Sequence, residues 1–148
     1  MKGKVQDIAK YVITCSERIG KPISNLQLQP ILYLLWKKYY FQTQQVLFDD
    51  DYFFAWKFAP VIPSVYYEYY MYGAYPINLN LMEKFDEEKI PISTRLFIFH
   101  WLKNNKHKNV KELVDKVCHP FSAWADTIKT RGIKSIIPFE AITDENLL

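Results

Sequence analysis

The apolar residues of this chain recur over several segments at the spacing of an amphipathic helix. In the first segment the apolar positions lie three or four residues apart: Val5, Ile8, Ala9, Val12, Cys15 and Ile19. This spacing places them on one face of a helix. Gly20 and Pro22 follow, a combination that usually ends a helix. Helices of this kind must bury their apolar faces against a shared core, so the pattern predicts a mainly helical fold.

Two capping boxes mark where further helices begin. Ser24 and Gln27 stand three positions apart, so that each side chain can bond the backbone N–H of the other residue. Asn109 and Glu112 have the same spacing. The helix after Ser24 contains Pro30, which lacks the N–H that a helix interior needs. Either the helix starts at the capping box and kinks at Pro30, or its regular part starts at Pro30. We favour the kink, because the capping signal is strong.

The rest of the chain adds further helices and a few strands. We predict helices over residues 63–72, 94–102, 120–131 and 138–147, a strand over 52–58, and short strands near 46–48 and 133–137. The length of 148 residues suits one domain with one core, spanning residues 1–148. The predicted class is mainly α (α+β), a single helical domain with a small antiparallel β-sheet or hairpin.

Composition limits the cellular setting and the kind of partner. Cys15 and Cys118 are the two cysteines, too few for a disulfide-rich secreted scaffold. No signal peptide or membrane-length apolar run is present, so we expect a cytoplasmic protein without membrane contact. The net charge of +3 is too small to indicate nucleic acid by itself.

The predicted helix over 63–72 carries hydrophobic residues on two sides. Val65 and Tyr69 fall on one side, whereas Tyr67, Tyr70 and Met71 fall on the other. One buried stripe cannot cover both. Either another segment, such as the C-terminal tail, packs over the second side, or that side is an exposed patch. Tyrosine suits a protein-binding patch because it is large, stiff and able to hydrogen-bond at its tip.

The candidate partner-binding residues therefore centre on this helix and on the strand before it. They are Trp56, Tyr66, Tyr67, Tyr70 and Met71. We expect Trp56 to be partly a core anchor, with Pro60 and Pro63 shaping the turn into the helix.

Residues that could carry chemistry elsewhere have structural explanations that we favour. His119 stands beside Cys118, but adjacent side chains seldom aim at each other, and we expect His119 to bond the backbone near Pro120. The acidic run at 49–51 reads as a solvated turn, and the basic run at 103–111 as a linker that could alternatively form a nucleic-acid patch. We predict no catalytic residue, no metal site and no cofactor, and hence no enzyme.

Three stretches together resemble the Panacea domain family, which includes SocA-type antitoxins and phage-associated GepA-like proteins. The first combines residues 5–11 with 23–33; the second is Phe54–Tyr66, similar to an A-W-x-x-G-P-V-x-P-x-V-Y core; the third is Leu113–His119 followed by Trp124. The resemblance spans nearly the whole chain. It departs at Pro30, where the family commonly has Lys, and at Ala59, where it has Gly.

The resemblance implies a helical domain that acts by recognition. We accordingly predict an antitoxin-like domain that neutralises a partner protein, such as a cognate toxin, in a toxin–antitoxin or phage–host conflict. Alternatives are a phage or prophage inhibitor of a host defence protein, such as an anti-CRISPR, and a nucleic-acid-binding regulator. The partner, the mechanism of neutralisation and the oligomeric state are left open by the sequence. In the family-like stretches Pro60, Pro63, His119 and Trp124 are expected to be structural.

Overall fold

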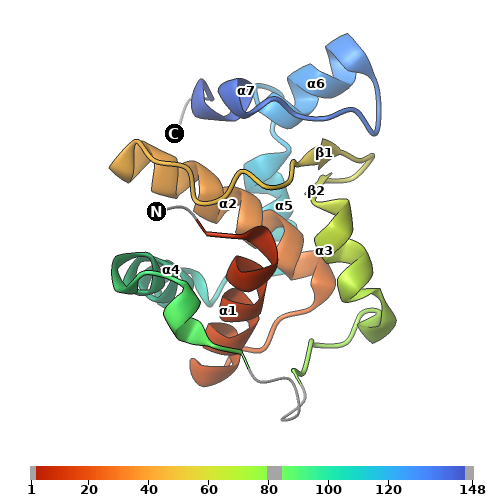
Figure 1. Ribbon diagram of the computed structural model, residues 1–148. Helices are drawn as coiled ribbons and strands as arrows, with labels where there is room; N and C mark the ends of the chain where they lie inside the picture. The colour runs from red at the N-terminus through yellow and green to blue at the C-terminus, as the bar shows by residue number, and fades with distance from the viewer. Residues whose placement is uncertain (1–2, 80–84, 146–148) are drawn as a thin grey trace.

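Helix α2 (Asn25–Thr43) runs through the middle of the computed structural model, with the other elements packed around it (Figure 1). The structure describes residues 3–79 and 85–145. Leu28, Leu32 and Trp36 of α2 are fully buried. A helix that is apolar around most of its circumference needs partners on several sides. Its place at the centre of the fold satisfies that requirement.

The described residues are mainly helical and form one compact domain. Besides α2, the elements are α1 (Val5–Arg18), β1 (Phe54–Ala55), β2 (Pro60–Val61), α3 (Pro63–Glu68), η1 (Tyr70–Tyr72), η2 (Glu87–Lys89), α4 (Ile92–Asn105), α5 (Val110–Val117), α6 (Ala123–Arg131) and α7 (Phe139–Thr143). β1 and β2 form a small antiparallel sheet. The predicted fold class is therefore confirmed.

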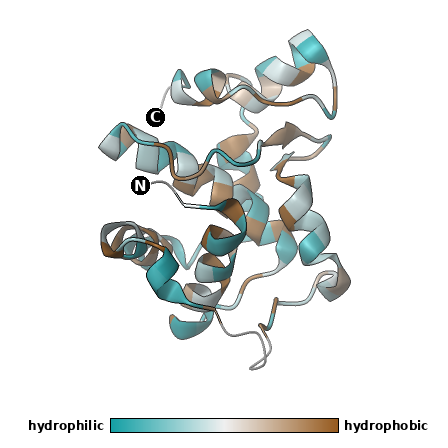
Figure 2. Ribbon diagram, viewed as in Figure 1, coloured by the Kyte–Doolittle hydropathy of each residue, from teal (hydrophilic) through white to brown (hydrophobic). Residues whose placement is uncertain are grey.

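The elements share one hydrophobic core. α1, α4, α5, α7 and β2 all contact α2, and their buried side chains form one cluster. α3 and α4 both contact α1 and lie on opposite sides of it in Figure 1. Figure 2 shows hydrophobic and hydrophilic residues along most of the helices, as expected where one side is buried and the other is exposed.

Both predicted capping boxes are present. The Ser24 side chain accepts from the Gln27 N–H, and the Ser24 N–H donates to Gln27 Oε1 at 2.9 Å. Asn109 and Glu112 make the equivalent pair of bonds at the start of α5. α2 begins directly after Ser24 and continues through Pro30, so the helix does not start at the proline.

The acidic run at 49–51 has a structural role that we did not predict. The Asp50 carboxylate accepts a hydrogen bond from the backbone N–H of Val5, at 3.0 Å from Oδ1, at the first turn of α1. Asp51 accepts from the Ser64 hydroxyl. Asp49 and Asp50 are exposed, as expected for a solvated turn. The hydrogen bond that Asp50 accepts adds a role that the sequence did not indicate, because a carboxylate at a helix N-terminus satisfies an otherwise unpaired donor and favourably opposes the helix dipole.

The strands are shorter than predicted. The expected strand over 52–58 is reduced to β1, because the chain turns at Trp56 to pair with β2 in the register Phe54↔Val61. Residues 46–48 and 133–137 make single β-bridges, through Phe48 and Ile136, and form no strand of their own. Segment 133–137 still lies alongside β1, since the Ala55 N–H donates a hydrogen bond to the Ser135 carbonyl at 2.8 Å.

Three helix boundaries also differ from prediction. The helix expected from Pro120 begins at Ala123, because Ser122 caps it through a hydrogen bond from the Ala125 N–H. The helix expected over 63–72 divides into α3 and the 3-10 turn η1. The last helix, α7, ends at Thr143 and is shorter than the predicted 138–147, of which residues 146–148 lie outside the described range.

An ion pair joins α2 to the end of the described chain. The Lys37 ammonium pairs with Glu145, and both side chains are buried. Glu145 Oε1 also accepts from the Ala123 N–H at 2.7 Å and from the Tyr33 hydroxyl at 3.4 Å. Burial, together with the neighbouring Glu145 charge, raises the pKa of Tyr33 well above its usual value. This network fixes the start of α6 against α2.

Candidate functional site

Four aromatic side chains meet on the surface around α3. We call Trp56, Tyr66, Tyr67 and Tyr70 the aromatic cluster. The ring centroids lie 5.1 Å apart for Trp56 and Tyr66, 5.4 Å for Tyr66 and Tyr67, and 6.1 Å for Tyr67 and Tyr70. These separations lie within the range of favourable aromatic pairs. The structure thus brings together four of the five residues that we predicted for partner binding.

Two rings of the cluster are largely exposed to solvent, together with the neighbouring Met71. Tyr67 is 62% exposed and Tyr70 is 60% exposed, and Met71, the fifth predicted residue, is 95% exposed. Val65 and Tyr69, on the other side of the same segment, are buried. The predicted division of this segment into two sides is confirmed. Within the described residues, no segment covers the side that carries Tyr67, Tyr70 and Met71.

Two buried amides of α2 hold the segment that carries the cluster. Asn25 Nδ2 donates to the Tyr66 carbonyl at 2.9 Å, and Gln29 Oε1 accepts from the Ile62 N–H at 3.0 Å. Gln29 Nε2 donates to Asn25 Oδ1 at 3.0 Å, which joins the two contacts. We did not predict this role. A signal was available, because Asn25 and Gln29 are polar residues four positions apart on a helix that is otherwise largely apolar.

The predicted structural residues hold the cluster from the other side. Pro63 is the first residue of α3, where its missing N–H costs no helical bond, and Pro60 is buried in β2. Trp124 Nε1 donates to the Trp56 carbonyl at 2.8 Å. Trp56 is half-buried and so both anchors the turn and adds to the exposed cluster.

His119 and Cys118 do not form a nucleophilic pair. His119 Nδ1 accepts from the backbone N–H of Phe121 at 3.2 Å, as predicted for a bond near Pro120. The Cys118 thiol lies 3.5 Å from the carbonyl of Phe58, to which it donates. Burial raises the pKa of this thiol to about 12, with Asp115 and Glu145 adding to the effect. A thiol held in its neutral form is a poor nucleophile at neutral pH.

Neither a metal centre nor a membrane span is found in the described part of the chain. No three His, Cys, Asp or Glu side chains within residues 3–79 and 85–145 are placed to hold a metal ion. No helix in these ranges is both long enough and apolar enough to cross a membrane.

Some exposed aromatics were missed by the sequence analysis. Phe58 in the turn between β1 and β2 is 77% exposed, and Tyr75 after η1 is 79% exposed. Both residues lie outside the regular helices, and their exposure depends on the tertiary positions of the turns. The spacing of residues in the sequence does not predict it.

No known protein-family model, no curated protein and no solved structure matches this chain. The resemblance to the Panacea family stays a prediction from the sequence motifs. Its function is accordingly inferred from the chain's own residues.

Proposed function

We propose that this domain binds a partner protein through the aromatic cluster and Met71, and that it neutralises this partner as an antitoxin does. The observation that carries the proposal is the exposure of Tyr67, Tyr70 and Met71. The two tyrosine rings lie beside Trp56 and Tyr66, whose rings contact one another. Contiguous exposed apolar patches of this kind typically mark interaction surfaces. The resemblance to SocA-type antitoxins adds the expectation that the partner is a toxin.

The composition of the cluster suits a binding hot spot. Tyrosine and tryptophan dominate the residues whose truncation weakens protein interfaces most. Their phenol hydroxyls can donate and accept hydrogen bonds at the rim, while the rings provide apolar contact area. Burying both tyrosine rings beneath a partner would remove a large apolar area from water, the main source of affinity in most interfaces.

The cluster also suits binding because its backbone is held before any partner arrives. Asn25 and Gln29 bond the α3 segment from beneath, and Trp124 bonds the carbonyl of Trp56. A pre-ordered surface pays less conformational entropy on binding than a flexible one. This supports direct recognition by a rigid face.

A phage or prophage inhibitor of a host defence protein is the alternative that shares this surface. Both functions require a protein partner, and the exposed cluster serves either. They differ in what the partner does when it is free. The free partner of an antitoxin arrests growth of the cell that makes it. A free defence protein leaves growth unchanged and acts only when a phage infects the cell.

The test first identifies the partner by co-purification and then measures the effect of that partner on cell growth. The tagged protein is purified from its native cell, and the protein that co-purifies in stoichiometric amount is identified and expressed alone. Growth arrest by that protein, relieved by the wild-type domain but not by a Tyr67→Ala/Tyr70→Ala variant, is the expected result. Relief that is equal with both forms would reject the cluster as the neutralising surface. A partner that does not arrest growth would reject the antitoxin role.

A further inference from the structure

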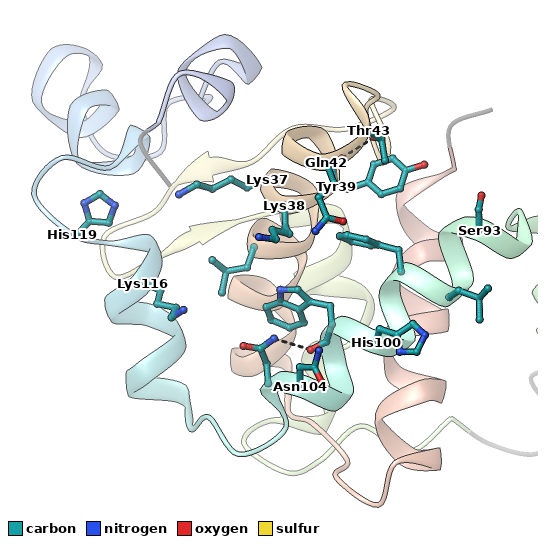
Figure 3. Close-up of a pocket in the computed structure, with 15 residues that line it drawn as sticks. Lys37, Lys38, Tyr39, Gln42, Thr43, Ser93, His100, Asn104, Lys116 and His119 are labelled. Carbon is teal, nitrogen blue, oxygen red and sulfur yellow. Dashed lines mark hydrogen bonds between the residues drawn. The ribbon is translucent and has the colours of Figure 1, made fainter. Parts of the chain in front are cut away.

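A groove of about 910 Å³ lies between α2, α4 and α5, and none of the residues of the aromatic cluster lines it. Figure 3 shows Lys38 on α2 and Lys116 on α5 extending into the space between these helices. In the same view His119 and His100 lie at opposite ends of the lining residues. The groove is therefore long, with basic side chains along it.

The groove carries uncompensated positive charge. Its lining includes Lys37, Lys38 and Lys116 and contains no Asp or Glu. Lys37 is neutralised by Glu145, which does not line the groove. Neither Lys38 nor Lys116 makes a salt bridge with any residue in the described ranges. Lys38 Nζ lies over the Phe41 ring, 5.5 Å from its centroid, and this contact with a neutral ring leaves the positive charge in place. The lining thus includes two lysines without an anionic partner among the described residues.

The pKa of Lys116 is lowered first by burial and then by the like charges around it, of which Lys108 has the largest effect. The positive charges of Lys37 and Lys38 lower this pKa further. Holding like charges together costs free energy, which an anion in the groove would offset.

The other lining groups suit the base of a nucleotide. Phe97 and Trp101 are half-buried aromatic residues on α4, and bases stack on aromatic rings of this kind. Asn104 and Asn105 each offer an amide donor and acceptor. Asn105 Nδ2 donates to the Trp101 carbonyl at 2.8 Å, which orients that amide. A carboxylate ligand needs donors alone, whereas a base edge needs donors and acceptors together.

We propose that the groove between α2, α4 and α5 binds nucleotides, with Lys38 and Lys116 contacting phosphate and Phe97 and Trp101 contacting the base. A free nucleotide and a unit of single-stranded nucleic acid present the same chemistry to these residues. This inference is independent of the proposed protein partner, since the two surfaces share no residue.

The test measures binding of a fluorescein-labelled decathymidylate by anisotropy at low salt. Wild type is compared with Lys38→Gln/Lys116→Gln and with Lys129→Gln/Lys134→Gln, a control that removes two exposed lysines of α6 and the segment after it. Both variants lose the same charge. The groove variant should bind at least about tenfold more weakly than wild type, because two phosphate contacts are lost, whereas the control should stay within about twofold.

Competition by unlabelled ligands shows whether the groove binds free nucleotides or single-stranded nucleic acid. Displacement of the labelled strand by adenosine monophosphate supports recognition of a free nucleotide, and binding without such displacement supports a single-stranded ligand. Absence of binding at low salt would overturn the proposal, as would equal loss in the two variants. The proposal would also be overturned if a decaglutamate peptide displaced the labelled strand as effectively as unlabelled decathymidylate does. The groove would then bind an acidic protein segment.

Discussion

Trp124 donates from its indole Nε1 to the backbone carbonyl of Trp56 at 2.8 Å, across 68 positions of sequence. This bond connects α6 to the turn after β1, where the aromatic cluster begins. The ring of Trp56 contacts Tyr66 and Tyr67 in turn. The position of the cluster therefore depends on the C-terminal part of the domain as well as on α3.

Replacing Trp124 by Phe should destabilise the domain by about 1–3 kcal/mol, because the partly buried carbonyl of Trp56 loses its donor. Chemical denaturation of the two proteins measures this difference. Trp101→Phe is the matched control, since the Trp101 indole N–H has no acceptor among the described residues. A loss in W124F no larger than in W101F would show that the indole bond contributes nothing.

Lys37→Met should be strongly destabilising, by about 3–5 kcal/mol, because it leaves the buried Glu145 carboxylate without its cation. Lys38→Met removes the same charge from an exposed neighbour and should change stability by less than about 0.5 kcal/mol. Thermal and denaturant unfolding of both variants give the comparison.

A double variant separates loss of charge from loss of packing. Lys37→Met/Glu145→Gln removes both charges and keeps an oxygen that accepts from the Ala123 N–H. It should recover a large part of the stability lost in K37M, since a buried pair replaced as a whole is often nearly neutral. No recovery would mean that the lysine stem, and not its charge, holds α2 against the C-terminal segment.

Asp50→Ala should cost about 0.5–2 kcal/mol of stability, because the Val5 N–H at the start of α1 loses its acceptor. Asp50→Asn keeps an oxygen in place and loses only the interaction of the charge with the helix dipole. We therefore expect D50N to lie between D50A and the wild type in denaturant unfolding. D50N as unstable as D50A would assign the whole effect to charge.

Ionisation of the Cys118 thiol should weaken the fold at alkaline pH. Burial raises its pKa to about 12 in the folded state, whereas the thiol of an unfolded chain ionises near its ordinary value of about 9. The unfolded chain therefore releases a proton first, so stability is complete below about pH 8 and falls as the pH rises toward 12.

The measurement is the free energy of unfolding between about pH 8 and 9, where most tyrosine hydroxyls, whose ordinary pKa is about 10, still carry their proton. Cys118→Ala should show a smaller fall across this range than the wild type. Iodoacetamide should label Cys118 slowly in the folded protein at pH 9 and rapidly in denaturant. Equal slopes for C118A and wild type, or rapid labelling of the folded thiol, would contradict the raised pKa.

The features predicted from sequence are those that depend on nearby residues. The Ser24 and Asn109 capping boxes and the two sides of the 63–72 segment follow from spacings of three or four positions, which a helix imposes locally. Ser122 is also a good capping residue, but Pro120 suggested an earlier start and the cap of α6 was missed. Proline is compatible with a turn as well as with a first helical position.

The features that the sequence could not reveal depend on contacts between distant segments. Asp50 bonds Val5 across 45 positions, and no local pattern marks that pairing. β1 is short because its register with β2 and with residues 134–137 leaves only two paired residues on it. The basic groove draws Lys38 and Lys116 from different helices, so neither stands out in a charge count.

The proposed recognition surface is tested most directly by the affinity of the purified partner for three forms of the domain. The forms are wild type, Tyr67→Ala/Tyr70→Ala, and Phe41→Ala/Phe121→Ala, which removes two exposed aromatic rings outside the cluster. Each is first shown to be folded by its thermal unfolding, and binding is then measured by calorimetric titration. We predict that Y67A/Y70A binds at least about tenfold more weakly, as for loss of one or more hot-spot residues, while F41A/F121A binds like wild type. Equal affinity of Y67A/Y70A and wild type would contradict the claim that this domain recognises its partner through the aromatic cluster.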